Sequence, residues 1–417
     1  MSTTRRMLAV VLAGALLPLT ACSDLLTLDV EAPGRIADGD LNDPDAVPGL
    51  VVGMSYDLTD GVDATLQDVN MAGGEIGHGG SYDFGSIPQG MFKQDDTDWD
   101  AEWGSMSQAR WVAEAGLRRI AEILDPAQFE RSANVARAYL LGGFANRLMG
   151  ELQCRTVIDG GPDLPHTENF TRADSLFSRA IQIGQAAGAT DVVRAAYGGR
   201  ASVRAWLGRW TEAATDAQQV PTDFVYSSIF SISNQNDFVY ETTYRREFSL
   251  YGTMWVPYPD DPRVPWRIPV DNDGQVLKGQ DGQTPFYQQL KWTDEGDDVP
   301  LTKGTEMRVL QAEAALRQNQ FGAAEQFLNQ ARAHYGMDDL TLPTTAVQAW
   351  PVLRFERYAT LWLEGRRLWD LRRWAAEGAP MKDSFSDGRD LCFPISNEEM
   401  RSNRNVSAQW GGCPTCG

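Results

Sequence analysis

Hydrophobic residues recur every three to four positions along most of this chain, which is the spacing of amphipathic helices. One such run follows Asp43-Pro44-Asp45, a helix-start signal, and extends to about Leu58. The same spacing predicts helices over 103–124, 133–149, 171–187, 304–318, 323–335 and 351–374. We therefore predict a mainly α-helical protein.

Two of the helical pairs resemble each other. Ala201 and Ala312 each lie nine residues before an aromatic residue, Trp210 and Phe321, and each aromatic is followed three residues later by alanine. The tetratricopeptide helix–turn–helix has similar features, since small residues let its helices pack closely and an aromatic closes the turn. We expect a tetratricopeptide-like scaffold of degenerate helix pairs.

Two segments interrupt the helical spacing. Residues 71–100 are rich in glycine, aspartate and aromatic residues, and residues 222–300 contain turn sequences such as Trp255-Val256-Pro257-Tyr258-Pro259. We expect the first to be an irregular loop and the second to be a long insertion with a few short strands. Long structured loops on a helical scaffold commonly carry function.

The start of the chain predicts a lipoprotein. Arg5 and Arg6 precede an apolar run that ends near Leu19, and small residues then lead to Cys22. The run is too short to span a bilayer as a helix. The Cys22 thiolate is placed to receive a diacylglycerol as a thioether once the leader is cut. An ordinary secretory signal with a chance cysteine is the alternative.

This interpretation divides the chain into three parts. We expect residues 1–21 to be a signal peptide, 22–40 to be the lipidated N-terminus and its tether, and 41–417 to be one helical domain with the insertion at about 222–300. No later stretch is long and apolar enough to cross a membrane.

The charge of the chain limits its ligands. The net charge is −20, and removal of residues 1–21 takes away two arginines and no acid, which gives −20 − 2 = −22. Such a surface argues against binding to nucleic acid or anionic lipid headgroups. It suits neutral or cationic ligands.

Four cysteines remain if Cys22 is lipidated, and they allow three disulfide pairings that the sequence does not distinguish. Cys413 and Cys416 flank Pro-Thr, but they lie in a C-terminal tail, whereas reactive pairs usually lie at a helix N-terminus. We expect a structural disulfide there, or pairing with Cys392. The three histidines are scattered without ligand spacing, so we expect no metal and no cofactor.

Three segments near the C-terminus carry a family resemblance. They are Arg354-Phe355-Glu356-Arg357, then Leu363-Glu364-Gly365-Arg366-Arg367-Leu368-Trp369-Asp370-Leu371-Arg372-Arg373-Trp374, and Cys392-Phe393-Pro394-Ile395 with Asn403-Arg404-Asn405. This pattern resembles the SusD/RagB family, nutrient-binding lipoproteins paired with TonB-dependent outer-membrane transporters. Ser396 and Arg404 stand where the family usually has proline. The resemblance implies a tetratricopeptide-like helical scaffold with irregular loops.

The charged residues of this motif resemble a catalytic acid–base set, but we interpret them as structural. Arg366 and Asp370 are spaced as an i,i+4 ion pair, and carboxylates that face arginine stay ionised. We expect a network that holds the terminal helix onto the loop after it, formed by Glu356, Arg357, Glu364, Arg366 and Asp370. We therefore expect no enzyme.

Aromatic rings stack on the C–H faces of sugars, and polar side chains hydrogen-bond their hydroxyls. The resemblance implies a glycan platform in the early loop, and the insertion supplies similar groups. We predict ligand contacts from two sets of residues, Tyr82, Phe84, Trp99 and Trp103, and Trp255, Tyr258, Asp260 and Arg263. For each aromatic taken alone, packing in the core is the alternative.

The leading hypothesis is therefore a binding protein on the outer face of the outer membrane. It captures an oligosaccharide or another small nutrient and passes it to a SusC-like TonB-dependent transporter. The alternative is a tetratricopeptide-type adaptor lipoprotein that assembles envelope proteins. A lipid-anchored glycoside hydrolase ranks last, because no pair of carboxyl groups is marked for that chemistry.

Overall fold

The computed structural model describes residues 38–93, 97–231 and 234–407. The described residues from Asp43 onward form one compact unit. Of the preceding unit, residues 1–42, the described part is the 3-10 helix η1 (Asp38–Asn42). The predicted signal peptide and Cys22 lie outside the described residues.

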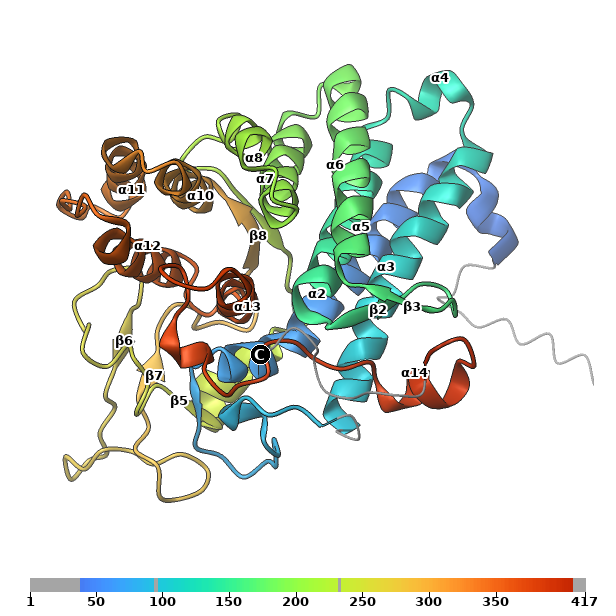
Figure 1. The fold of residues 1–417 in the computed structure, drawn as a ribbon. Coiled ribbons are helices and arrows are strands. Elements are labelled where there is room, and N and C mark those ends of the chain that lie inside the picture. Colours follow the sequence, from blue (N-terminus) through green and yellow to red (C-terminus); the bar gives the residue numbers. More distant parts are fainter. Residues whose placement is uncertain (1–37, 94–96, 232–233, 408–417) are drawn as a thin grey trace, which may run out of the picture. The chain divides into compact units, whose positions relative to one another are not determined.

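The compact unit is a succession of packed helices, and the prediction of a mainly α-helical, tetratricopeptide-like scaffold is confirmed (Figure 1). Its first half contains α2 (Val47–Ala72), α3 (Thr97–Ile123), α4 (Pro126–Phe129), α5 (Ala133–Leu152) and α6 (Thr167–Ala187). Helices α3, α5 and α6 match three predicted helices. Helix α2 continues beyond the predicted end at Leu58, because Val62, Leu66 and Val69 extend its buried stripe.

The two similar helical pairs are α7 (Thr190–Trp206) with α8 (Trp210–Ala217), and α10 (Gly304–Arg317) with α11 (Phe321–His334). Trp210 and Phe321 are the first residues of the second helix of each pair, as the repeat predicts. The turns also correspond, since Gly208 (φ 76°) and Asn319 (φ 56°) both adopt the left-handed conformation two residues earlier.

Close approach between helices depends on glycine at one point. An added Cβ at Gly143 of α5 or Gly199 of α7 would lie 2.6 or 2.4 Å from the ring of Phe177 on α6. The three helices therefore meet around this buried ring, and the core continues from it through the rest of the compact unit.

Short antiparallel strand pairs fasten the loops to the helices. The pairs are β1 (Gly77–His78) with β5 (Phe248–Ser249), β2 (Arg155–Val157) with β3 (Asp163–Pro165), β4 (Val225–Ser228) with β8 (Val299–Lys303), and β6 (Trp266–Arg267) with β7 (Gln288–Gln289). The predicted short strands of the insertion are thus present. The β1–β5 pair joins the early loop to the insertion, where α9 (Asp237–Val239) runs into a π-helix, η4 (Tyr240–Arg245).

The prediction of one continuous helix over 351–374 is wrong. Helix α12 (Ala346–Thr360) ends before α13 (Arg367–Glu377) begins. Between them Leu363 (φ 61°) and Gly365 (φ 68°) are left-handed, and buried Asn70 holds the break by donating to the Leu363 carbonyl (2.9 Å) and accepting from the Gly365 amide (3.2 Å). The chain then reaches α14 (Asn397–Ser402).

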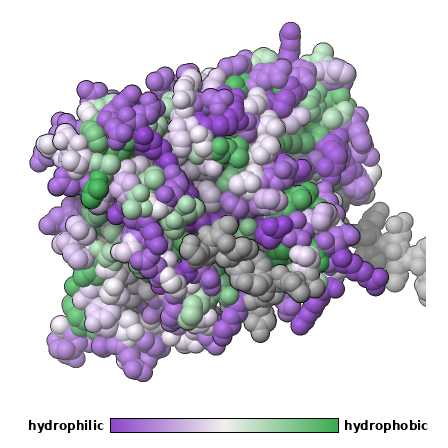
Figure 2. Space-filling view, viewed as in Figure 1, coloured by the Kyte–Doolittle hydropathy of each residue, from purple (hydrophilic) through white to green (hydrophobic). Residues whose placement is uncertain are grey.

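Hydrophilic residues cover most of the face shown in Figure 2, and hydrophobic residues lie between them in small patches. Within the described part of the chain, no helix has both the length and the apolar character needed to cross a bilayer.

Candidate functional site

The aromatic residues predicted for the early loop separate into two groups. Trp99 and Trp103 lie in the first turns of α3 and are buried, with 1% and 4% of their surface exposed. The Trp99 ring stacks on Phe393 at 4.2 Å, and its Nε1 donates to the Pro394 carbonyl (2.6 Å). Trp99 therefore fastens α3 to the C-terminal segment, and Trp103 lies edge-on to Trp99 at 6.2 Å. Being buried, neither indole presents an open face to a ligand.

Tyr82 and Phe84 line a cleft of about 530 Å³. The other walls come from α2 (Ala64, Gln67, Asp68), α3 (Ala101, Glu102, Ser105), Asp83 of the same loop and Glu241 of the π-helix. Tyr82 is 44% exposed, whereas Phe84 is only 9% exposed and packs edge-on against Tyr82, with 6.3 Å between the ring centres. The volume is in the range of clefts that hold small ligands. We call this the Tyr82 cleft.

A buried carboxylate fixes the orientation of Tyr82. The side chain of Glu247 is fully buried, and its Oε1 accepts from the Tyr82 amide (2.7 Å) and contacts His78 Nε2 (3.2 Å). Gly80 is required beside it, because an added Cβ would lie 1.9 Å from the Glu247 carboxyl carbon. Arg245 completes the arrangement, with its guanidinium carbon 3.9 Å from the centre of the Tyr82 ring.

Burial alone would raise the pKa of Glu247, but hydrogen bonds from the Tyr82 and Ser81 amides and from His78 outweigh it and hold the pKa below its ordinary value. The ionised carboxylate is therefore the form that holds the loop. No periodic pattern marks Glu247 or Arg245 in the sequence, and the sequence analysis missed both.

Acidic side chains dominate the polar surface of the Tyr82 cleft. Asp68, Asp83, Glu102 and Glu241 line it. Burial raises the pKa of Glu241, against the opposing effect of Arg245. Asp63 directly precedes Ala64, which lines the cleft, and burial together with the charge of Asp237 raises the pKa of Asp63 to about 7. The cleft thus offers hydrogen-bond acceptors and an aromatic ring to a neutral or cationic ligand. Within residues 38–93, 97–231 and 234–407, no group of three His, Cys, Asp or Glu side chains is placed to hold a metal ion.

The predicted residues of the insertion do not reach this cleft. Trp255 is fully buried, with Phe355 and Trp362 6.1 and 6.3 Å from it. Arg263 is also buried and bonds to Asp261 (2.7 Å) and Glu356 (2.5 Å). These two side chains pack the insertion against the C-terminal helices.

Tyr258 and Asp260 remain exposed at the surface of the insertion. Tyr258 lies 4.7 Å from Phe355 and lines a separate cleft of about 410 Å³ with Arg354 and Asp383. The two predicted ligand loops therefore face different clefts. The Tyr82 cleft has more acidic side chains, four against one, whereas the cleft beside Phe355 has more aromatic ones, three against two.

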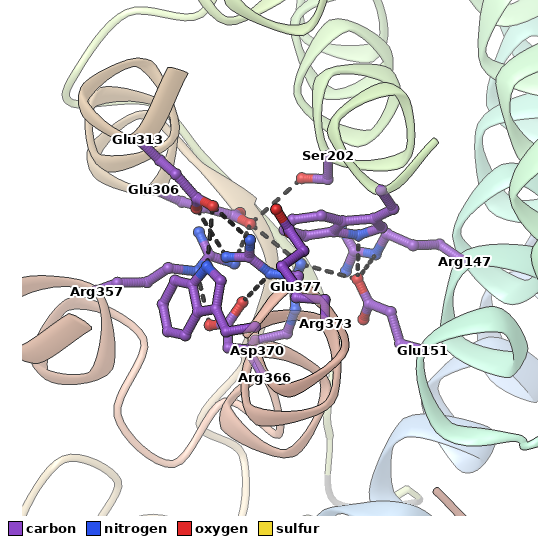
Figure 3. A network of polar contacts seen from close by, with 12 residues as sticks. Arg147, Glu151, Ser202, Glu306, Glu313, Arg357, Arg366, Asp370, Arg373 and Glu377 are labelled. Carbon is purple, nitrogen blue, oxygen red and sulfur yellow. Dashed lines mark hydrogen bonds and ion pairs between the residues drawn. The ribbon is translucent and has the colours of Figure 1, made fainter. Parts of the chain in front are cut away.

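The charged motif near the C-terminus forms a buried network (Figure 3). Arg357 of α12 donates to Asp370 of α13 (2.6 Å), and Arg373 donates to the other Asp370 oxygen (2.8 Å). The predicted ion pair between Arg366 and Asp370 is wrong. Arg366 is the N-cap residue of α13 and its carbonyl accepts from the Asp370 amide (3.2 Å), but its side chain contacts Glu151 of α5 (3.0 Å) and Glu306 of α10 (3.1 Å) instead.

Other acidic groups of the motif also find distant partners. Glu364 lies 2.7 Å from Lys291 and 2.5 Å from Lys303, and Glu356 lies 2.8 Å from Arg332. Burial opposes ionisation of Glu364, but the two lysines hold its pKa below its ordinary value, which does not suit a general acid. The network therefore joins α13 to α5 and α10, and not to the loop after it as predicted.

One disulfide joins Cys154, just after α5, to Cys392. It excludes the predicted pairing of Cys392 with the tail cysteines. Cys413 and Cys416 lie outside the described residues, so their predicted disulfide stays a prediction.

Comparisons with known proteins agree with this fold. The model of the SusD family matches residues 293–412, which include the charged motif. No curated protein sequence matches the chain.

Solved structures resemble it over most of its length. A SusD/RagB family protein from Bacteroides thetaiotaomicron is 13% identical, with a TM-score of 0.65 over 84% of this chain and 94% of that one. A SusD-like protein from Bacteroides fragilis is 13% identical, with a TM-score of 0.66 over 90% and 99%. A SusD-like carbohydrate binding protein from Bacteroides vulgatus is 13% identical, with a TM-score of 0.59 over 79% and 83%.

Proposed function

We propose that this chain is a SusD/RagB-type cell-surface lipoprotein that binds a glycan and delivers it to a TonB-dependent outer-membrane transporter, because the SusD family model matches residues 293–412 and SusD-like structures share the fold. Cys22 carries the lipid anchor in this account, and the helical unit faces outward from the outer membrane. A related structure is described as a carbohydrate binding protein, which supports a sugar as ligand.

The Tyr82 cleft is the observation that carries the proposal. Its aromatic ring is exposed, and its orientation is fixed by Glu247 and Arg245. A preformed ring face reduces the entropy lost on binding, and the surrounding carboxylates accept hydrogen bonds from sugar hydroxyls. The acidic lining favours neutral sugars over uronic or sulfated ones.

Replacing Tyr82 with alanine tests this site. We expect wild-type protein to be retarded in native gels that contain a soluble neutral polysaccharide, with starch, inulin, xylan, mannan and β-glucan as the probes. Tyr82→Ala should weaken retardation by roughly tenfold, about 1.4 kcal/mol, because it removes a central aromatic contact. Tyr56→Ala is the matched control, since Tyr56 is 51% exposed on α2 and lines none of the clefts described above.

Equal retardation of Tyr82→Ala and wild type would mean that the polysaccharide binds outside the Tyr82 cleft. Loss of retardation in Tyr258→Ala alone would assign binding to the cleft beside Phe355 instead.

A further inference from the structure

A second cleft, of about 560 Å³, lies beside the middle of α3, and none of the predicted ligand residues lines it. Helix α3 contributes Ser107, Gln108, Arg110, Trp111 and Val112. The β2–β3 turn contributes Val157, Asp159 and Gly160, and α14 contributes Glu399. We call it the Trp111 cleft.

An indole is left in solvent at the edge of this cleft. Trp111 is 52% exposed, whereas Trp99, Trp103 and Trp255 are buried. An exposed indole that lines a polar cleft offers a flat face on which a sugar ring can stack.

An arginine–aspartate pair lies beside the indole. Arg110 is 3% exposed, and its guanidinium contacts Asp159 at 2.6 Å and Glu114 at 3.2 Å. Its Nε has no hydrogen-bond partner among the described residues. Asp159 is held in the left-handed conformation (φ 49°), and its side chain stays 49% exposed. Arg110 therefore holds Asp159 in place, and the exposed Asp159 carboxylate offers an acceptor to a sugar hydroxyl.

The walls of the cleft are fixed before any ligand arrives. Asn403 donates to the Gly161 carbonyl (2.9 Å) and to Glu399 (2.8 Å), and Asn405 donates to the Gly160 carbonyl (2.8 Å). These asparagines belong to the segment Asn403-Arg404-Asn405 of the C-terminal motif. The segment therefore holds α14 against the β2–β3 turn and keeps the cleft open in one shape.

Charge and position define the ligand class. Asp159 and Glu114 offset Arg110 and Arg172, and Glu399 adds a further negative charge, so an anionic sugar is disfavoured. Helix α3 contributes Ala101 and Ser105 to the Tyr82 cleft, and Arg110 and Trp111, from other faces of the helix, to the Trp111 cleft. The two clefts follow each other by about 10 Å along the axis of α3.

We propose that the Trp111 cleft is a second saccharide-binding site, in which Trp111 stacks on a neutral sugar ring and Asp159, held by Arg110, accepts hydrogen bonds from its hydroxyls. The site extends the proposed function, on which it rests, by giving a polysaccharide a second contact on the same protein. Two linked contacts raise the affinity for polysaccharide above that of either cleft alone.

The test uses the full-length protein and the same five neutral polysaccharides in native gels. Trp111→Ala should weaken retardation at least fivefold, Trp111→Phe should retain most of it, and Asp159→Asn should weaken it without altering the ring. The double variant Trp111→Ala/Tyr82→Ala should lose retardation. Unfolding in urea should be unchanged for Trp111→Ala, because its ring is half exposed.

Three outcomes overturn the site. If Trp111→Ala is retarded as strongly as wild type while the retardation of Tyr82→Ala is weaker, the second site is excluded and the proposed function still stands. If Trp111→Ala no longer co-purifies with the transporter but is retarded as strongly as wild type, the Trp111 cleft contacts a protein and not a saccharide. Absence of retardation in every gel contradicts both proposals.

Discussion

Replacing Glu313 with alanine is expected to lower the free energy of unfolding by about 3–5 kcal/mol, because it removes the acceptor of several buried donors and takes one of its two carboxylate partners from Arg373. Glu313 is fully buried on α10. Its carboxylate accepts from Arg373 Nη1 (2.6 Å) and Nη2 (2.8 Å), from Trp374 Nε1 (3.0 Å) and from Arg317 Nη2 (2.8 Å). A truncated side chain satisfies none of these donors, and water has little access to replace it.

The pH dependence follows from the same contacts. Burial alone would raise the pKa of Glu313, but the guanidinium groups of Arg373 and Arg317 outweigh it and hold the pKa below its ordinary value of 4.5. Since the pKa is depressed in the folded state, the stabilisation is present above about pH 4.5 and is lost as the pH falls below it. The difference between wild type and Glu313→Ala should therefore narrow in acid.

Urea unfolding followed by circular dichroism measures the effect. Glu212→Ala is the matched control, since Glu212 pairs with Arg209 on an exposed surface, and its midpoint should stay close to that of wild type. A Glu313→Ala midpoint equal to that of Glu212→Ala would show that the network does not hold α13 in place.

Replacing Cys22 with serine is expected to move the protein out of the membrane fraction. Serine lacks the thiolate that forms the thioether, so no diacylglycerol is attached. Each buried methylene contributes about 0.8 kcal/mol, and two or three acyl chains hold a protein stably on a bilayer. The change therefore removes nearly all of the predicted anchoring energy.

Fractionation of cells and immunoblotting test this prediction. Cys416→Ser is the matched control, because it removes another cysteine and should leave the protein in the membrane pellet. Retention of Cys22→Ser in the membrane fraction, after a carbonate wash, would mean that something other than this cysteine anchors the chain.

Local spacing predicted the helix pairs well, because the signals lie within one supersecondary unit. Ala201 with Trp210 and Ala312 with Phe321 are close in sequence, and each aromatic opens the second helix of its pair. The same logic failed for Arg366 and Asp370. Their backbones keep the helical spacing, since the Asp370 amide donates to the Arg366 carbonyl. The Arg366 side chain nevertheless pairs with Glu151 and Glu306, which come from distant segments.

Contacts between segments that are far apart in the sequence could not be predicted from local sequence patterns. Trp99 and Trp255 lie in loop-like sequence, yet each is covered by aromatic residues from the C-terminal third, Phe393 in one case and Trp362 in the other. Likewise, Glu247 holds Tyr82 from 165 positions away. The sequence predicts a ligand region in the early loop, which stays a prediction, and the residues that shape this loop depend on tertiary packing.

The central claim is that this protein captures a glycan and passes it to a TonB-dependent transporter. The most direct measurement is affinity purification of tagged full-length protein from outer membranes in mild detergent, with identification of the proteins that co-purify. The account predicts recovery of a large TonB-dependent transporter in near-stoichiometric amount, also with Tyr82→Ala. Recovery of other envelope proteins without any such transporter would contradict it and favour an adaptor.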